Sequence, residues 1–225
     1  MRDYVLYSGG ARGADALFSV LLDEVGAEGR VFHIRPEGNE SVAPSLKKLG
    51  IQPYVCNKEL LRQASEEMFK LGLRKFNPAN LGGALQCRNY YQVVKSGCVV
   101  AVAEIEAEDW SSVNGGTNTA VQLGIKLNLP VYVLDIVDAN WYSFRYPSEE
   151  YSFNKESGVF VEMPEDFVPD IPRKFTGVGT RRVEDYNICK NGEWIPSPGF
   201  VGKEQLSILR EKLKMALKIN FIDKE

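Results

Sequence analysis

The chain has 225 residues, of which 44% are hydrophobic and 25% charged, as is typical of a soluble globular protein. Its formal net charge is −3 and its isoelectric point is near 5.5, which argues against the basic face that nonspecific nucleic-acid binding needs. No apolar run approaches the ~18 residues of a membrane-spanning helix. The opening Met-Arg-Asp leads directly into an apolar strand rather than a secretory signal, so we expect a cytoplasmic protein.

Four cysteines and one histidine limit the metal and redox chemistry that the chain can perform. The cysteines (Cys56, Cys87, Cys98 and Cys189) show no Cys-x-x-Cys spacing. We therefore expect reduced thiols and no metal site. His33 lies within the strand-like run Arg30 to Arg35, and we interpret it as an ordinary strand residue rather than a catalytic base.

The first motif is a glycine-rich turn between an apolar run and a helical pattern. Tyr4-Val5-Leu6-Tyr7 leads into Ser8-Gly9-Gly10-Ala11-Arg12-Gly13, and a helix is predicted over about Asp15 to Val25. Such a helix N-terminus offers unpaired backbone N–H groups to an anion, and Arg12 adds donors suited to a phosphate. We interpret Ser8, Gly9, Gly10 and Arg12 as a phosphate-binding turn. A plain connecting turn is the alternative, because the spacing matches neither the P-loop nor Gly-x-Gly-x-x-Gly.

Strand and helix patterns then alternate along the chain. Strands are predicted at Val31 to Ile34, Pro53 to Cys56, Cys98 to Ala103 and Pro130 to Asp135. Helices are predicted at Leu60 to Leu71, Arg88 to Lys95 and Ala120 to Leu127, with a short helix closing at Lys47 to Gly50 and a loop at Asn77 to Gly83. This alternation predicts an α/β fold: a Rossmann-like, open, mostly parallel sheet with helices on both faces.

A second glycine-rich turn, Asn114 to Thr119, precedes the helix at Ala120. In open parallel sheets, the loops that follow the strands meet at one edge, and ligands bind there. We therefore expect Gly115, Gly116 and Thr117 to lie near the first turn and to hold the same ligand.

The stretch from Trp141 to Met163 breaks the alternation with loosely spaced aromatic residues, among them Tyr142, Phe144, Tyr151 and Phe153. It predicts a small antiparallel excursion from the sheet. The aromatic side chains either cover the core as part of an edge hairpin or form a wall beside the ligand, since bases stack on such rings. We also expect part of this stretch to be buried in a homodimer.

These motifs together resemble the SLOG superfamily, which includes the DNA-processing protein DprA and the cytokinin-activating phosphoribohydrolases once called lysine decarboxylases. Ser8 to Asp15 is similar to its Ser-Gly-Gly-Ala-Arg-Gly-Ile/Ala-Asp motif, and Arg88-Asn89 before a helix is similar to its next shared block. Gly115-Gly116-Thr117 is similar to the third block, which contacts a nucleotide phosphate in these families. The resemblance covers about residues 4 to 135 and implies a nucleotide-binding Rossmann-like domain.

The strand that normally opens this family is missing from its usual place. Its Gly-x-Gly-Ser/Thr-Arg ending is matched instead near the C-terminus, at Phe175-Thr176-Gly177-Val178-Gly179-Thr180-Arg181, before a helical pattern at Lys203 to Lys218. The simplest interpretation is a circular permutation within one domain, with a core at 1–135, an insertion at 141–163 and a permuted strand and helix at 173–218. A chance match is the alternative. Permutation predicts that Phe175 to Gly177 lies in the sheet near Tyr4 to Tyr7, and that Gly179, Thr180 and Arg181 face the ligand.

The resemblance implies binding more clearly than catalysis. The phosphoribohydrolase pattern Gly-Gly-x-Gly-Thr-x-Glu-Glu places its two carboxylates at Thr119 and Ala120 of this chain, so they are absent. Arg88 is available to match the family's arginine, and Glu104 or Asp15 is the candidate replacement for the carboxylate that N-glycosidic hydrolysis needs.

The function that we predict is binding of a nucleotide-type small molecule: a nucleoside monophosphate, a nucleotide sugar or an ADP-ribose-like compound. The protein would serve as a sensor or carrier of this molecule or as an enzyme that acts on it. We expect no required cofactor and, at most, a bound nucleotide. N-glycosidic hydrolysis and DprA-like binding of single-stranded DNA are the alternatives, although the negative charge argues against nucleic acid. A purely structural role stays open, because a fold does not imply a function.

Overall fold

The computed structural model describes residues 3–39, 46, 49, 51–147, 158–183, 187–190, 193–196 and 200–224. The strands are β1 (Tyr4–Ser8), β2 (Gly29–Pro36), β3 (Gln52–Cys56), β4 (Val99–Ala103), β5 (Val131–Asp135), β6 (Trp141–Arg145), β7 (Val159–Glu162), β8 (Lys174–Gly179), β9 (Asn187–Lys190) and β10 (Glu193–Pro196). The helices are α1 (Ala14–Glu24), α2 (Lys58–Lys70), α3 (Leu81–Val93), α4 (Asn118–Lys126) and α5 (Lys203–Lys218). Short turns of helix are η2 (Gly115–Thr117), η3 (Arg181–Val183) and η4 (Ile219–Asp223). Within this described part, no helix is both long enough and apolar enough to cross a membrane.

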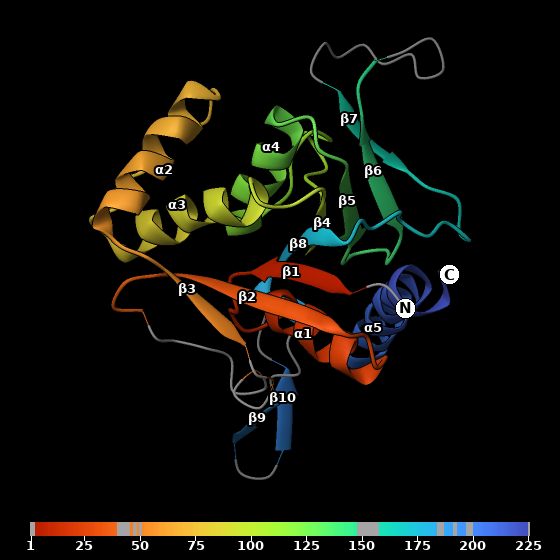
Figure 1. Ribbon diagram of the computed structural model, residues 1–225. Helices are drawn as coiled ribbons and strands as arrows, with labels where there is room; N and C mark the ends of the chain where they lie inside the picture. The colour runs from red at the N-terminus through yellow and green to blue at the C-terminus, as the bar shows by residue number, and fades with distance from the viewer. Residues whose placement is uncertain are drawn as a thin grey trace.

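Eight strands form one sheet in the order β3-β2-β1-β8-β4-β5-β6-β7 (Figure 1). The six strands from β3 to β5 are mutually parallel, and β6 and β7 add to the edge of β5 in antiparallel fashion. The predicted α/β class, with a mostly parallel sheet and a small antiparallel excursion, is confirmed.

The late strand β8 lies in the middle of the sheet, between β1 and β4. Leu6 pairs with Phe175 on one side, and Val99 pairs with Thr176 on the other. The predicted neighbourhood of Phe175 to Gly177 and Tyr4 to Tyr7 is therefore confirmed. The end of the chain also returns to its beginning, since the ring of Phe221 lies 5.8 Å from that of Tyr4.

Helices cover both faces of the sheet. Figure 1 shows α1 and α5 below the sheet and α2, α3 and α4 above it. Side chains alternate between the faces of a strand, so Val100 and Val102 of β4 pack into the cluster with α1 and α5. Val99 and Ala101 pack on the other face. A strand buried on both faces needs the continuous apolar run that β4 has.

Helix α3 begins well before the predicted Arg88. Asn80 accepts a hydrogen bond from the Gly83 N–H at 2.7 Å, which is the side-chain cap of a helix N-terminus. A Cβ on Gly83 would overlap the carbonyl of Asn77. The two glycines that predicted a loop here are therefore part of the first helical turn, and the predicted loop is wrong in its second half. The short helix expected at Lys47 to Gly50 lies largely outside the described residues.

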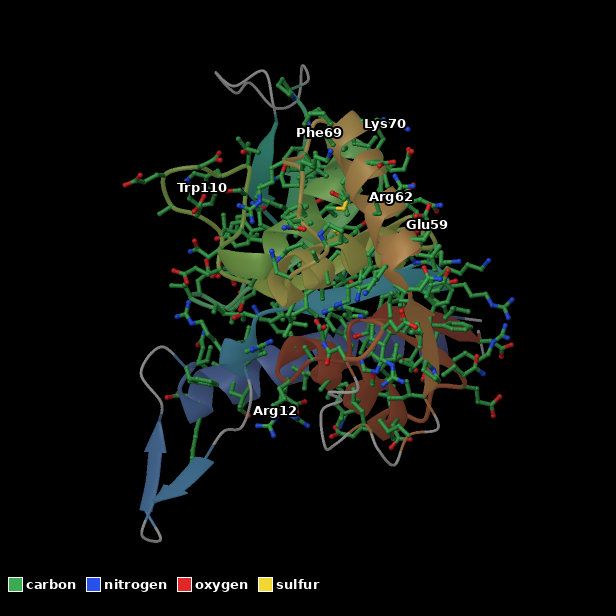
Figure 2. The ribbon with its side chains drawn as sticks, turned by 90° about the vertical axis from the view of Figure 1, so that its left-hand side faces the viewer. Arg12, Glu59, Arg62, Phe69, Lys70 and Trp110 are labelled. Atoms are coloured by element: carbon green, nitrogen blue, oxygen red, sulfur yellow. The ribbon has the colours of Figure 1, made fainter. Side chains whose placement is uncertain are left out.

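The aromatic stretch covers the molecule's own core. Trp141, Tyr142 and Phe160 are each less than 5% exposed, as the edge-hairpin interpretation expects. The neighbouring Trp110 is 43% exposed (Figure 2), and its carbonyl accepts a hydrogen bond from the Phe160 N–H. Tyr151 and Phe153 lie outside the described residues, and the homodimer stays a prediction.

The hairpin formed by β9 and β10 was not expected from the sequence. The two strands pair antiparallel as a separate sheet and project from the body of the molecule in Figure 1. The sequence Asn191-Gly192 between them is a strong hairpin signal. It was missed because the segment from Phe175 to Lys218 was interpreted as one strand followed by one helix.

Candidate functional site

A pocket of about 370 Å³ opens at the carboxyl ends of β1, β8 and β4. Nine of its lining residues are among those predicted for the site: Asp15, Arg88, Asn89, Gly115, Gly116, Thr117, Gly179, Thr180 and Arg181. The other lining residues are Ala11, Leu85, Gln86, Asn114, Ala120 and Val178. The predicted site residues Ser8, Gly9, Gly10, Arg12 and Glu104 are not in this lining.

The turns after β1 and β8 are packed directly against each other. The Ala14 N–H donates to the Thr180 carbonyl at 3.1 Å. Gly13, with φ 86° and ψ −137°, lies so close that a Cβ would be 2.5 Å from that oxygen and 2.6 Å from Arg181 Cα. The two motifs that are farthest apart in the sequence thus form one wall of the pocket.

The first glycine-rich turn is closed by its own side chains. Ser8 Oγ accepts from the Gly10 N–H at 3.2 Å. The Asp15 carboxylate accepts from the N–H groups of Ala11 at 3.4 Å and Gly179 at 3.1 Å. Three backbone donors that an anion was expected to use therefore already have acceptors within the chain.

Gly9 and Gly10 make room for two side chains from other elements. A Cβ on Gly9 would overlap the guanidinium of Arg88, and one on Gly10 would overlap the imidazole of His33. His33 Nε2 donates to the Gly9 carbonyl. The sequence predicted glycines that admit a ligand, whereas here the space above them holds Arg88 and His33, which explains why Ser8, Gly9 and Gly10 are buried.

Arg12 is exposed, and its side chain points outward on the side of the sheet that carries α1, opposite α2 (Figure 2). It follows Ala11 in the tight turn, and the positive φ of Gly10 and Gly13 on either side turns the chain there. This arrangement therefore does not place the Arg12 side chain in the pocket, where we expected it to contact a phosphate.

Arg88 is a buried cation with few close partners. Its Nη1 donates to the Ile34 carbonyl at 3.4 Å, and its Nη2 lies 3.8 Å from the Asp15 carboxylate. Its Nε has no hydrogen-bond partner among the described residues, although the side chain is 91% buried, being 9% exposed. Unsatisfied buried donors are rare because they cost free energy. The Nε itself is shut off from the pocket, so an anion would meet Arg88 through the part of its side chain that lines the pocket, where the guanidinium has only these distant partners.

Asp15 is the carboxylate next to this cation. Burial raises its pKa, and Arg88 and the hydrogen bonds from Ala11 and Gly179 oppose that rise. Among the described residues that line the pocket, Asp15 is the sole acidic group and stands against two arginines, Arg88 and Arg181. The lining therefore favours an anionic ligand.

The second glycine-rich turn is open. Gly115 and Gly116 are exposed, and no atom lies within 4 Å of the position that a Cβ on Gly115, whose φ is +81°, would take. Neither η2 nor α4 has a side-chain cap at its N-terminus. The N–H of Asn118 bonds to the Gly115 carbonyl, and Gly115, Gly116 and Thr117 line the pocket. The N-terminus of α4 thus offers the kind of anion site that we had expected at the N-terminus of α1.

Sequence reasoning missed Gln86 and Asn114. Gln86 Oε1 is buried without a hydrogen-bond partner among the described residues, and its Nε2 lies near Gly116. Both residues line the pocket. Gln86 precedes the helix predicted to begin at Arg88, and an earlier helix start would have placed Gln86 on the same element as Arg88 and Asn89.

Glu104 follows β4 and is engaged away from the pocket. Its carboxylate forms an ion pair with Arg182 of η3, and the two side chains are 31% and 41% exposed. Its backbone carbonyl accepts from the Asn114 N–H at 2.7 Å. Of the two predicted carboxylates, Asp15 alone lines the pocket.

The buried His33 predicts a pH-dependent stability. Burial is the largest cause that lowers its pKa, while the bond to Gly9 opposes it. A histidine whose pKa is lowered on folding contributes stability above its unfolded pKa, about 6.5, which is lost as the pH falls below that value. Urea unfolding at pH 7.5 and 5.5 should show a larger loss for the wild type than for His33→Gln, which keeps a donor but does not titrate. Equal losses would contradict this role, since Asp15 is present in both proteins.

Comparison of the chain with protein-family models, with curated proteins and with solved structures finds no match. Fold and pocket define an α/β protein with a candidate anion site at the carboxyl edge of its sheet, and the function is argued from that geometry.

Proposed function

We propose that the protein binds a phosphate-bearing, nucleotide-type small molecule in this pocket. The observation that carries the proposal is Arg88: a buried guanidinium that lines the pocket beside the second glycine-rich turn and whose nearest partners, Asp15 at 3.8 Å and the Ile34 carbonyl at 3.4 Å, are distant. A phosphate would give the guanidinium closer, charge-assisted partners, and it also suits the dipole of α4.

The phosphate is best accommodated at the second turn. Gly115, Gly116 and Thr117 of η2 line the same pocket as Arg88. Arg181 of the third turn lines it too. At the first turn, Asp15 and Ser8 already accept the corresponding N–H bonds. A phosphate there would meet the Asp15 carboxylate and be repelled.

The rest of the ligand has an amide-rich and apolar surface to contact. Gln86, Asn89 and Asn114 offer hydrogen bonds to ribose hydroxyls or base edges, while Leu85 and Val178 offer apolar contact. The described lining contains no aromatic ring, so the proposal does not rely on base stacking. A volume of about 370 Å³ is near the lower end of ligand pockets, which favours a single nucleotide over a dinucleotide.

The resemblance to the SLOG superfamily supports the same class of ligand. Under the permuted interpretation, β8 takes the place of the family's first strand, and its central position between β1 and β4 agrees with that. Gly179, Thr180 and Arg181 then lie at the ligand edge, where they are among the pocket's lining residues.

A thermal-shift screen tests this proposal. A nucleoside monophosphate present at a hundred times its Kd should stabilise the protein by about 2.7 kcal/mol, which corresponds to roughly 5–10 °C in Tm for a chain of this size. The matching nucleosides without phosphate serve as controls and should give a much smaller shift. The absence of a shift with every phosphate-bearing compound would contradict the proposal.

Cleavage of the N-glycosidic bond is the second candidate, and the buried Asp15 in the pocket lining favours it. A carboxylate whose burial raises its pKa is suited to acid–base work. Chromatography of adenosine monophosphate incubated with the protein should then reveal free adenine, and Asp15→Asn should abolish its release. Turnover that survives this substitution would exclude Asp15 as the catalytic group. DprA-like binding of single-stranded DNA has no such support, since no described pocket residue offers a stacking ring.

A further inference from the structure

One residue, Glu104, contacts both of the turns that border the mouth of the pocket. Its backbone carbonyl holds the N–H of Asn114, where the second turn begins. Its carboxylate holds the guanidinium of Arg182, in the turn after β8. The link therefore runs from one rim of the pocket to the other through the end of β4.

Arg182 is itself tied to the backbone around it. Its N–H donates to Thr180 Oγ1 at 3.2 Å, and its carbonyl accepts from the Val201 N–H at 2.9 Å. Thr180 is held in turn by a bond from its N–H to the Val102 carbonyl at 2.9 Å. Arg181 lies between Thr180 and Arg182 and lines the pocket, so the position of its backbone follows from the anchors on both sides.

We propose that Glu104 and Arg182 are a positioning pair, which sets the distance between the two rims and directs Arg181 toward the anionic ligand. This inference rests on the proposed function for its binding consequence. The pair touches neither ligand nor reacting atoms, and it acts through Arg181 and Asn114. Glu104 is thereby assigned a role different from the catalytic one that the sequence suggested, since its carboxylate is engaged with Arg182 rather than directed at the pocket.

The side chains of Glu104 and Arg182 are partly exposed to solvent, so we expect their ion pair to add little to the free energy of unfolding. Ion pairs between solvent-accessible side chains contribute little to folding, because water and salt screen them. Its effect should therefore appear locally, at the two rims, and in ligand affinity. Glu104→Gln removes the charge and keeps the backbone carbonyl that holds Asn114, so it isolates the ion pair.

The first arm of the test needs no ligand. Amide hydrogen exchange in Glu104→Gln and in Arg182→Gln should be several-fold faster over Asn114–Thr117 and over Arg181–Val183, with the urea midpoint unchanged. A merely structural role would instead speed exchange through the whole sheet, β4 included. Glu108→Gln, an exposed carboxylate in the loop that follows Glu104, is the matched control and should leave both rims as in the wild type. Rims that exchange at the wild-type rate in both ion-pair variants would overturn the proposal.

The second arm measures the affinity for adenosine 5′-monophosphate by calorimetry. Each single variant should bind about five- to tenfold more weakly, and the double variant no more weakly than either single, because the two residues act as one unit. The reversed pair, Glu104→Arg with Arg182→Glu, should recover most of the affinity. Wild-type affinity in both single variants would overturn the positioning pair and leave the nucleotide proposal intact. Failure of the wild type to bind either this nucleotide or inorganic phosphate would count against the proposed function, and the exchange arm would still test the pair.

Discussion

The Gly13→Ala variant is expected to lose about 3–5 kcal/mol of unfolding free energy. Gly13 has φ 86° and ψ −137°, a conformation that is essentially restricted to glycine and costs other residues about 1–3 kcal/mol. The added methyl would also be 2.5 Å from the Thr180 carbonyl oxygen and 2.6 Å from Arg181 Cα. Both are backbone atoms, which cannot swing aside, and overpacking of this kind costs roughly 1–3 kcal/mol more.

Gly26→Ala is the matched control for this prediction. Gly26 also has a positive φ, +70°, but no atom lies within 4 Å of the position that its Cβ would take. It should lose only about 1 kcal/mol, from backbone strain alone. Urea unfolding of the two variants compares a substitution that costs backbone strain alone with one that also forces a steric overlap. If both lose the same free energy, the turns after β1 and β8 are not in the close contact described, and the wall of the pocket must be rebuilt.

The strands of the parallel part of the sheet could be located from the sequence to a large extent, because continuous apolar runs mark strands that are buried on both faces. Val99 to Ala103 is such a run, and its alternate residues pack on opposite faces of the sheet. The place of β8 beside β1 was predicted for another reason. Gly177 to Arg181 resembles the Gly-x-Gly-Ser/Thr-Arg ending of a strand that normally lies beside the Ser-Gly-Gly strand. Helix α3 was harder, because Gly82 and Gly83 are usually loop signals and the cap at Asn80 is a matter of local geometry.

The sequence predicted which residues lie at the candidate site better than it predicted what each of them contacts. The glycine-rich turns and Arg88 were identified from their types and spacing, and the turns after β1, β4 and β8 do meet at one edge of the sheet. A pattern of glycines cannot say what enters the space that they leave. At Gly9 and Gly10 that space holds Arg88 and His33, which come from α3 and β2, and pairings between distant elements leave no mark in the local sequence.

Replacement of Arg88 by Met is expected to weaken binding of adenosine 5′-monophosphate roughly a hundredfold. Each charge-assisted hydrogen bond contributes about 1.5–3 kcal/mol, and a guanidinium can form two with one phosphate, so about 3 kcal/mol is lost. Arg62→Met, which removes an exposed arginine of α2 (Figure 2), is the control and should leave the Kd unchanged. Arg12→Met should resemble this control, because Arg12 is not among the residues that line the pocket. A loss of affinity like that of Arg88→Met would instead support the sequence interpretation of the first turn.

Loss of Arg88 would also leave Asp15 buried without its cation, so the fold must be tested alongside the affinity. Arg88 lowers the pKa of Asp15, and without it that pKa rises further. An acid whose pKa is raised on folding costs stability as the pH rises past its unfolded value near 3.9, so Arg88→Met should be least stable, relative to the wild type, at neutral and higher pH and recover as the pH falls. Adding Asp15→Asn removes the unpaired charge and should restore much of the stability at pH 7.

The double variant Arg88→Met with Asp15→Asn therefore separates binding from folding. It should regain much of the stability that Arg88→Met loses at neutral pH, because no unpaired charge stays buried. It should still be less stable than the wild type, because an amide can accept from only one of the two N–H groups, of Ala11 and Gly179, that the Asp15 carboxylate holds. Its affinity for adenosine 5′-monophosphate should nevertheless remain far below that of the wild type, because the guanidinium is still missing. Recovery of nucleotide binding together with stability would mean that Arg88 acts only on the fold, and the anion site would then have to be sought in Arg181 and the open N-terminus of α4 alone.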